Sequence, residues 1–423
     1  MLPFRQQDRA TLADMKFVVA TYGTEGDTRP LAALCRALID AGNDVHLLAD
    51  AATLGSATAL GVPATALAGD IRKALQPGKP TTPAQTTRDL AEITNTNAES
   101  WLREITAAAA GCDAIIVSAL ASFVGLSAAE CLGVKGIGAG FIPITPTAAF
   151  ASPFLPPAMV PGWLNKVSHR LINSAVWRLL RESTNAARAS VCGLPARRGV
   201  FTDHPILWGV SPSLVPRPDD YPANTWICGQ WLEPAPQWSP PPDLQEFLAA
   251  GEPPVYVGFG SMAGLLPPRM LDELIAGIGG RRALLYPGWG VVRAQQLPSN
   301  FLVVRDTPHS WLFPRTSTVI HHGGAGTTHS AARAGVPSVV VPFAGDQLFW
   351  ADRLHRLGVA PAPLKVRGLR ASELAERLAF AQRPDVRARA TALGTQMRSE
   401  DGLGNATAAL GTLMAGSGTA AHV

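Results

Sequence analysis

Cysteine is scarce in this chain, and the few cysteines do not pair along the sequence. The 423 residues contain five cysteines, widely spaced and without a CxxC motif. An odd, scattered set of this kind argues against a disulfide framework and against a cysteine-based zinc site. It is typical of a reducing compartment, and we expect a cytoplasmic protein.

Long apolar runs are missing as well. The most apolar long stretch, residues 107–129, contains Gly111 and Asp113, so we predict no transmembrane segment there. The N-terminal letters MLPFRQQDRATLAD include no apolar core and are not expected to form a secretory signal. These observations favour a soluble protein.

Clusters of one charge sign are absent. The formal net charge is +4, but lysine and arginine are scattered along the chain. Without a basic stripe we expect no nucleic-acid partner. A weak attraction for a small anionic substrate is compatible with this charge.

Hydrophobic residues make up 47% of the chain, which is enough to form the cores of two domains. Residues 1–14 read as an N-terminal extension and residues 15–233 as a first domain. The proline-rich segment 234–242 (PAPQWSPPP from Pro234) reads as a linker. Residues 243–423 form the second domain, and its last helices can pack back on the first.

Both halves show alternating strands and helices, which predicts an α/β protein with two parallel sheets. A proline-rich loop, Phe141 to Pro161, interrupts the first half. The helix expected after it, from Trp163 to Ser190, carries apolar residues four apart on one face. These residues are Trp163, Val167, Leu171, Ala175 and Leu179.

The most informative stretch is 317–347, STVIHHGGAGTTHSAARAGVPSVVVPFAGDQ. A short β-branched strand leads into a turn with three glycines, and a helix is expected from Thr327 to Ala334. Unpaired N–H groups and the helix dipole at such a helix start favour an anion, and glycine lets a phosphate approach. An ordinary α/β turn is the alternative for one such loop. A second polar loop follows the next strand and carries Asp346 and Gln347, so the pair of loops favours a diphosphate site.

Ligands of open parallel sheets bind outside the carboxyl ends of the strands. Four loops in this chain satisfy that rule. They follow the first strand (residues 22–29), the first strand of the second half (residues 260–262) and the two strands of the stretch just described. We therefore expect these loops to meet at a cleft between the two domains.

At this level of detail the sequence resembles a known family. HHGGAGTTHSAARAGVP followed by PFAGDQ resembles the donor signature of family 1 glycosyltransferases of the GT-B fold, and in particular the bacterial antibiotic and sterol glucosyltransferase branch. GTEGDTRP, GFGSM and PHSWLFP agree in order and cover both halves. The resemblance implies two Rossmann-like domains facing across a cleft. It also implies an enzyme that transfers a sugar from a nucleotide diphosphate, with inversion.

The resemblance also assigns roles by position. His322, Gly324, Gly326 and Thr327 would contact the diphosphate, and Ser261 would reach it from the other side. Asp346 and Gln347 would hold hydroxyls of the sugar, and the segment from Asp306 to His309 would face the nucleobase. A structural role is the alternative for His322, and His321 is expected to be structural or to lie on the sugar side.

No Asp-x-Asp triplet is present. The charge of the leaving diphosphate would then be met by hydrogen-bond donors rather than by a metal, and we predict no metal site and no cofactor. Asp27, in the loop after the first strand and in the GTEGD motif, is our candidate general base. The alternative is that Asp27 caps the helix expected to begin at Pro30.

Asp346 and Gln347 suit a well-hydroxylated hexose, so UDP-glucose is the first choice of donor and a dTDP-sugar the second. Large apolar side chains in and beside the proline-rich loop suit a lipophilic acceptor of sterol, terpenoid or polyketide type. Packing of the loop on its own domain is the alternative. The candidate acceptor residues are Phe141, Phe150, Phe154 and Trp163.

Two other functions share the same phosphate loop. A sugar-nucleotide epimerase of the GT-B fold would need no lipophilic acceptor wall. A non-catalytic partner protein would bind the nucleotide sugar without needing Asp27. A dinucleotide-binding dehydrogenase is disfavoured, because the first loop lacks G-x-G-x-x-G.

Overall fold

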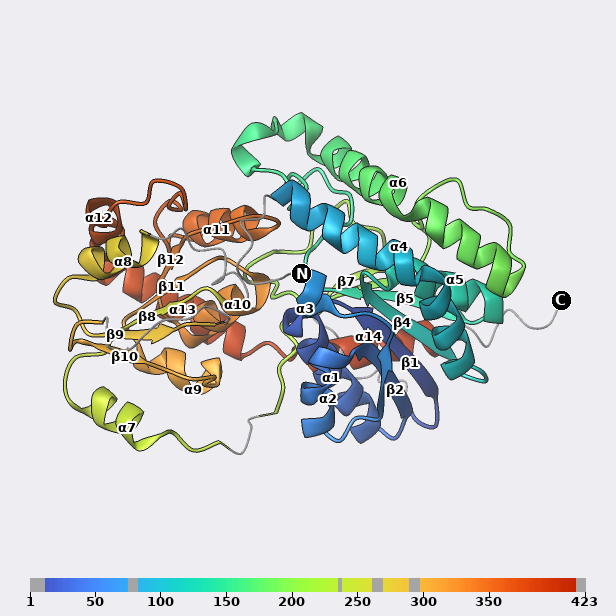
Figure 1. Cartoon of the computed structure of the whole chain (residues 1–423), viewed down its shortest axis with the longest axis horizontal. Helices are drawn as coiled ribbons and strands as arrows, with labels where there is room; N and C mark the ends of the chain where they lie inside the picture. Colours follow the sequence, from blue (N-terminus) through green and yellow to red (C-terminus); the bar gives the residue numbers. More distant parts are fainter. Residues whose placement is uncertain (1–11, 75–82, 235–237, 261–268, 289–296, 416–423) are drawn as a thin grey trace.

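The computed structural model describes residues 12–74, 83–234, 238–260, 269–288 and 297–415. Its two halves each contain a parallel β-sheet with helices on both faces (Figure 1). This is the α/β architecture predicted from the alternating pattern. In the region where the halves meet, which we call the junction, Arg29 of the first half lies 3.5 Å from Asp306 of the second.

Within the described residues the first sheet has seven parallel strands in the order β3-β2-β1-β4-β5-β6-β7. The strands are β1 (Lys16–Tyr22), β2 (Asp44–Asp50), β3 (Ala64–Leu67), β4 (Ala114–Ala119), β5 (Lys135–Gly140), β6 (Ile206–Trp208) and β7 (Thr225–Ile227). Alternate residues of β1 face opposite sides, as the two-residue period of a strand requires. Phe17 and Val19 pack toward α1 (Glu25–Asp40), whereas Val18 and Ala20 pack toward α4 (Pro83–Ala108) and α5 (Ser122–Leu132).

The second sheet has five parallel strands in the described part of the chain, in the order β10-β9-β8-β11-β12. They are β8 (Val255–Gly258), β9 (Ala283–Tyr286), β10 (Phe301–Val303), β11 (Thr318–His321) and β12 (Ser338–Val340). On one face the sheet packs against α8 (Met270–Ile278) and α12 (Ala371–Ala381). The other face packs against α7 (Pro242–Ala249), α9 (His309–Leu312) and α10 (Ala325–Ala334).

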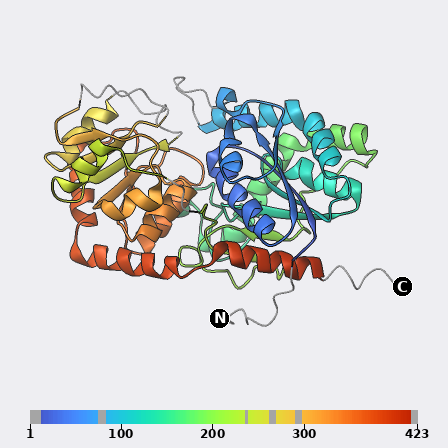
Figure 2. The same cartoon turned by 90° about the horizontal axis from the view of Figure 1, so that it is seen from below.

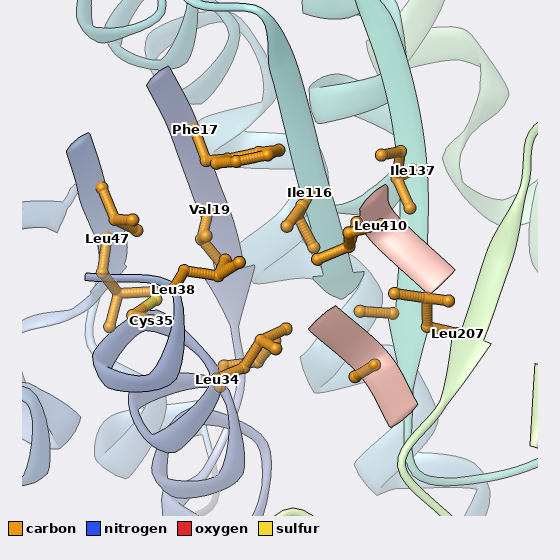
Figure 3. Close-up of a cluster of buried hydrophobic side chains, with 14 of the residues drawn as sticks. Phe17, Val19, Leu34, Cys35, Leu38, Leu47, Ile116, Ile137, Leu207 and Leu410 are labelled. Carbon is orange, nitrogen blue, oxygen red and sulfur yellow. The ribbon is translucent and has the colours of Figure 1, made fainter. Parts of the chain in front are cut away.

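The last helices return to the first half. After α13 (Pro384–Arg398), helix α14 (Gly402–Ala415) runs beneath the first sheet (Figure 2). Leu410 is fully buried in the cluster that contains Phe17 and Ile116 (Figure 3). The C-terminal segment therefore completes the core of the N-terminal half, an arrangement that the sequence had left open.

Several element boundaries differ from the expected ones, with local causes. The helix expected from Pro30 begins at Glu25, because Thr24 caps it, and Pro30 lies inside the helix as its sixth residue. The helix expected from Thr327 begins at Ala325. Strands β3 and β7, which were not expected, are edge strands of three or four residues.

The long helix after the proline-rich loop is α6 (Asn165–Cys192), preceded by two short 3₁₀ turns, η2 (Pro157–Met159) and η3 (Gly162–Leu164). Across the described ranges, no helix is long and apolar enough to cross a membrane.

Candidate active site

The turn after β11 is shaped by its own residues. Gly323 has φ +90°, and a Cβ there would lie 2.8 Å from Val340 Cγ1 and 2.9 Å from the backbone oxygen of Gln347. Glycine is therefore required by both conformation and space. His321 is fully buried, and its Nδ1 accepts the N–H of Gly323 at 3.1 Å. This hydrogen bond gives His321 the structural role that the sequence allowed.

Helix α10 begins at this turn without a side-chain cap. Gly324 is its N-cap residue, and among the described residues no side chain hydrogen-bonds to the first amides. Gly326 is exposed, and a Cβ built on it would meet no atom within 4 Å. Thr327 is partly exposed beside it. As far as the described residues go, the helix start thus has N–H groups without partners and no atom packed over Gly326, which is the arrangement that binds a phosphate.

His322 lies directly against this helix start. A Cβ on Gly324 would lie 3.2 Å from His322 Cε1, so the imidazole packs on the backbone of the N-cap residue. His322 Nδ1 is buried and has no hydrogen-bond partner among the described residues. Burial, and then the nearby His309, lower the pKa of His322 to about 4. At neutral pH the ring is therefore uncharged, with a ring nitrogen free to interact with a ligand.

His309 lies at the start of α9, on the nucleobase side of the expected site. Its ring stacks on Phe313 at 4.2 Å between centroids and 17° between planes. Burial lowers the pKa of His309 to about 4, although Asp306 opposes the shift. His309 and His322, both predicted to bind the donor, therefore lie close to each other. Ser261, predicted on the opposite side of the diphosphate, lies outside the described residues.

The loop after β12 holds its two polar residues in fixed positions. Gln347 Oε1 accepts the N–H groups of Phe343 at 2.6 Å and Ala344 at 3.1 Å. Trp350 Nε1 donates to Asp346 Oδ2 at 2.6 Å. Each side chain has one further polar atom, Asp346 Oδ1 and Gln347 Nε2. Neither atom makes a hydrogen bond within the described residues. They are the atoms left to hold a ligand.

Asp27 belongs to the capping box of α1. Its Oδ2 accepts the N–H of Thr24 at 2.9 Å, while the Thr24 hydroxyl accepts the N–H of Gly26 at 3.3 Å. The capping alternative is therefore realised, at the third helical position rather than at a helix start near Pro30. It occupies only one carboxylate oxygen, because Oδ1 has no hydrogen-bond partner in the described chain. Burial raises the pKa of Asp27, which makes it a stronger base than a solvated aspartate.

Asp27 and Asp346 lie close enough for their charges to interact. Burial first, and then the charge of Asp27, raise the pKa of Asp346 to about 6. An electrostatic effect between residues 319 positions apart in the chain requires the first loop and the second donor loop to lie close together. The structure thus brings the predicted base and the predicted sugar-binding residue into one site.

A charged contact at the same junction was not foreseen. Arg29 Nη2 lies 3.5 Å from Asp306 Oδ2, and Arg29 Nε donates to Glu25 Oε2 at 3.2 Å. The side chains of Arg29 and Asp306 are 48% and 74% exposed, so this bridge adds little stability. The sequence indicated the pairing of Glu25 with Arg29 only weakly, because these residues share one helix face only if the helix begins before Pro30.

A second unforeseen link joins α10 to the first half. His329 Nδ1 donates to the carbonyl of Ala325 at 2.7 Å, and His329 Nε2 accepts the N–H of Ser211 at 3.1 Å. Burial lowers the pKa of His329 to about 4, in keeping with a neutral ring that donates at one nitrogen and accepts at the other. The phosphate-binding helix start is thereby tied to the N-terminal half.

The four candidate acceptor residues lie in different surroundings. Phe141 packs edge-on against Trp231 at 5.4 Å, and Phe150 packs against Phe349 at 5.3 Å with only 9% of its surface exposed. Phe154 and Trp163 are 40% and 81% exposed. The residues thus do not form one wall, and packing explains Phe141 and Phe150. Contact of any of the four with an acceptor stays a prediction.

Comparisons with known proteins agree with this geometry. Residues 291–403 match the model for the erythromycin biosynthesis protein CIII-like C-terminal domain. The vancomycin aglycone glucosyltransferase of Amycolatopsis orientalis is 34% identical over 406 residues, covering 91% of this chain and 95% of that protein. The O-mycaminosyltylonolide 6-deoxyallosyltransferase of Streptomyces fradiae is 32% identical, with 93% and 96% covered. The chain belongs to the family 1 glycosyltransferases of the GT-B fold.

Other relatives of this family are longer than the chain. The sterol 3-beta-glucosyltransferase UGT80B1 of Arabidopsis thaliana is 31% identical over 412 residues, and the match covers 92% of this chain but 66% of that protein. The sterol 3-beta-glucosyltransferase of Neurospora crassa is covered over 27% of its length. Among solved structures, the glycosyltransferase of kitacinnamycin superposes with a TM-score of 0.70 at 19% identity, covering 95% of this chain and 99% of that one. VinC in complex with dTDP superposes with a TM-score of 0.67 at 21% identity, covering 96% and 100%. These likenesses confirm the predicted GT-B fold.

Proposed function

We propose that this family 1 glycosyltransferase moves a hexose from a nucleotide diphosphate sugar to a hydroxyl group of a lipophilic small molecule, with inversion and without a metal ion. The observation that carries the proposal is the pairing of an uncapped helix start with a carboxylate across the junction. The start of α10 suits the diphosphate, and Asp27 of the first half lies near Asp346 in the loop after β12.

The leaving group requires stabilisation of developing negative charge. The free amides at the start of α10 and the unpartnered Nδ1 of His322 offer hydrogen bonds at one place. A neutral His322 can donate one hydrogen bond, and a bound diphosphate would raise its pKa and favour its charged form. No metal ion takes part in this scheme.

The sugar would be held by the two polar atoms left free in the loop after β12. Asp346 Oδ1 accepts and Gln347 Nε2 donates, and their neighbours already fix both side chains. This pair suits adjacent ring hydroxyls, and we propose UDP-glucose as donor, with a dTDP-sugar as second choice. The names of two relatives support glucose, and the dTDP bound to VinC supports the second choice.

The reaction then needs one proton acceptor. The acceptor hydroxyl oxygen attacks the anomeric carbon, a new C–O bond forms, and the bond from that carbon to the diphosphate oxygen breaks. The electron pair leaves with the diphosphate, while Oδ1 of Asp27 takes the hydroxyl proton. Attack from the side of Asp27, opposite α10, inverts the anomeric centre.

The acceptor class is proposed as sterol, terpenoid or polyketide. Relatives named for sterols, for a vancomycin aglycone and for a tylosin precursor support an acceptor with a large apolar or polycyclic body. The exposed Phe154 and Trp163 in the region after β5 are available for such a body.

A substitution pair tests the assignment. We expect Asp27→Asn to abolish transfer while the UDP affinity stays within a few-fold, because the amide can still cap Thr24. We expect His322→Ala to weaken UDP binding about tenfold to a hundredfold, from the loss of a charge-assisted hydrogen bond. Transfer is followed by mass spectrometry with several nucleotide sugars and a panel of lipophilic alcohols, and binding by calorimetry.

Three outcomes would contradict the proposal. UDP binding that is lost in Asp27→Asn would make Asp27 structural. Conversion of the nucleotide sugar to an epimer without any alcohol would favour the epimerase alternative. Loss of transfer in EDTA, restored by magnesium, would disprove the metal-independent scheme.

A further inference from the structure

Exposed apolar side chains are concentrated in one segment of this protein. Among the described residues, every large hydrophobic side chain that is exposed lies between positions 154 and 179. They are Phe154, Met159, Trp163, Val167, Leu171, Val176 and Leu179. A contiguous exposed apolar face of this kind marks a site of interaction with a partner or a membrane.

Most of this face belongs to α6. Trp163, Val167, Leu171 and Leu179 are spaced by multiples of four residues and are 81%, 40%, 65% and 50% exposed. Residues spaced in this way are neighbours along a helix surface. The opposite side of α6 packs on α4 and α5, with Trp177 and Leu180 buried. An amphipathic spacing normally predicts the buried face of a helix, but here the apolar side chains are exposed. Helix α6 itself lies at the outer edge of the first half (Figure 1).

The same helix surface carries unpaired positive charge. Arg170, Arg178 and Arg181 are exposed, and none of them forms an ion pair or hydrogen bond in the described part of the chain. Four other exposed arginines on helices, Arg29, Arg103, Arg356 and Arg389, each have a carboxylate partner one turn away. The face is therefore apolar along its centre and basic beside it.

Acidic neighbours offset only part of this charge. Lys166 is neutralised by Asp220 at 3.0 Å. Near Leu179 the exposed carboxylate of Glu92 on α4 lies beside Arg88, and Glu182 follows Arg181 on α6. Positive charge therefore remains in excess along α6.

We propose that this face, from Met159 to Leu179, docks on the surface of an anionic lipid bilayer. Apolar side chains led by an exposed tryptophan, with arginines at their side, are the features of a helix that lies in the plane of a membrane interface. Anionic headgroups attract the unpaired arginines. A symmetric contact between two copies would instead bring the arginines of both copies to one interface, which like-charge repulsion opposes.

The position of the face connects it with the donor site. The turn η2, which contains Met159, contacts α11 (Gln347–Arg356), and α11 begins with the sugar-binding Gln347. In Figure 1 the segment before α6 reaches over α11. If the proposed function holds, docking would place the acceptor-binding side of the enzyme against the bilayer. A lipophilic acceptor could then enter the active site from the lipid. Binding to lipid itself does not depend on that function.

Vesicle sedimentation tests the docking. The full-length protein is mixed with vesicles of phosphatidylcholine alone or of equal parts phosphatidylcholine and phosphatidylglycerol. We expect binding to the anionic vesicles and a loss of about tenfold or more in Trp163→Ser/Leu171→Ser, because exposed apolar side chains drive insertion. We expect a similar loss in Arg170→Gln/Arg178→Gln/Arg181→Gln.

A matched control removes the same amount of charge elsewhere. Lys365, Arg367 and Arg387 are exposed in the second half and have no ion pair in the described residues. The triple variant Lys365→Gln/Arg367→Gln/Arg387→Gln should bind anionic vesicles as the unchanged protein does. All these positions are exposed, so circular dichroism should show the native fold in each variant.

Three results would overturn the proposal. They are no binding to anionic vesicles, equal loss in the control triple variant, and retained binding in Trp163→Ser/Leu171→Ser. A concentration-dependent dimer that this double variant abolishes, measured by analytical ultracentrifugation, would assign the face to a second copy instead. Because binding is measured without any nucleotide sugar, failure of this proposal is separable from failure of the proposed activity.

Discussion

The two carboxylate oxygens of Asp27 have different surroundings. Oδ2 accepts the N–H of Thr24, and Oδ1 has no hydrogen-bond partner among the described residues. Gly23 makes this possible, because a Cβ at that position would lie 2.7 Å from Asp27 Cγ. The carboxylate therefore packs directly on the backbone of the residue that follows β1.

We predict that Gly23→Ala lowers turnover by about tenfold to a hundredfold, because an added methyl group moves the carboxylate from its position. UDP affinity should stay within a few-fold, since α10 is untouched. Gly26→Ala is the matched control: its Cβ would meet only Thr24 Oγ1, at 3.5 Å, and turnover should be unchanged. Steady-state kinetics with calorimetry distinguishes these cases, and equal turnover in both variants would contradict this role of Asp27.

Asp346 has a pKa of about 6 in the folded protein, above its ordinary value of 3.8. Protonation therefore favours the folded state, and this stabilisation is lost as the pH rises through about 6. We predict that Asp346→Asn raises the free energy of unfolding by about 1–2 kcal/mol at neutral pH, and not at about pH 4. The same substitution should reduce transfer, because a charged acceptor for a sugar hydroxyl is lost.

Urea unfolding at the two pH values checks this prediction. The exposed Asp44→Asn, at the start of β2, serves as control and should change stability at neither pH. In the unchanged protein, turnover should fall as the pH falls through about 6, where Asp346 gains its proton. A stability gain that persists in acid would show that burial of the charge is not the cause.

At the scale of elements, the start of α10 is the feature proposed to bind the phosphates. Gly326, its second residue, has no atom within 4 Å of where a Cβ would lie. We predict that Gly326→Ala leaves the free protein equally stable, or stabilises it by about 0.5–1 kcal/mol through helix propensity. UDP affinity should fall at least about tenfold, because the methyl group fills the space that a phosphate needs.

Gly55→Ala provides the control for that prediction. Gly55 also lies at the start of a helix, α2 (Gly55–Ala59), with open space around it and away from the junction. It should leave UDP affinity unchanged in calorimetry. If Gly326→Ala also leaves it unchanged, the diphosphate does not lie over the start of α10.

Helices and strands were predictable where their hydrophobic pattern repeats within a short stretch of sequence. The strands at the centre of both sheets have continuous apolar runs, because their two faces are covered by helices. The edge strands β3 and β7 have three or four residues and no clear period, so they were missed. The start of α1 was misplaced because Pro30 was taken as the first helical residue, whereas Thr24 and Asp27 form the cap.

At the scale of the whole molecule, the two halves are held by segments that cross between them. Helix α14 completes the core of the first half, and His329 joins the start of α10 to Ser211. Glu400, between α13 and α14, accepts the hydroxyls of Ser211 at 2.8 Å and Ser213 at 2.6 Å. These contacts hold Asp27 and the donor loops in fixed positions relative to each other.

We predict that Leu410→Ala lowers the free energy of unfolding by about 2–5 kcal/mol, because a fully buried leucine leaves a cavity beneath the first sheet. Thr412→Ala, on the exposed side of the same helix, should cost less than about 0.5 kcal/mol. Urea unfolding followed by tryptophan fluorescence measures both. Equal effects of the two substitutions would show that α14 does not support the core of the first half.

The sequence by itself determined the alternating strands and helices, the glycine-rich turn before α10, and the identity of the polar residues in each loop. These features follow from short windows, because the period of a strand or helix and the needs of a turn are local. Only the tertiary structure decided that Asp27 lies near Asp346, that Arg29 contacts Asp306, and that the apolar stripe of α6 is exposed. Those contacts depend on how the two sheets and α14 pack together. The residues involved are hundreds of positions apart, so a short window of sequence does not indicate that they meet.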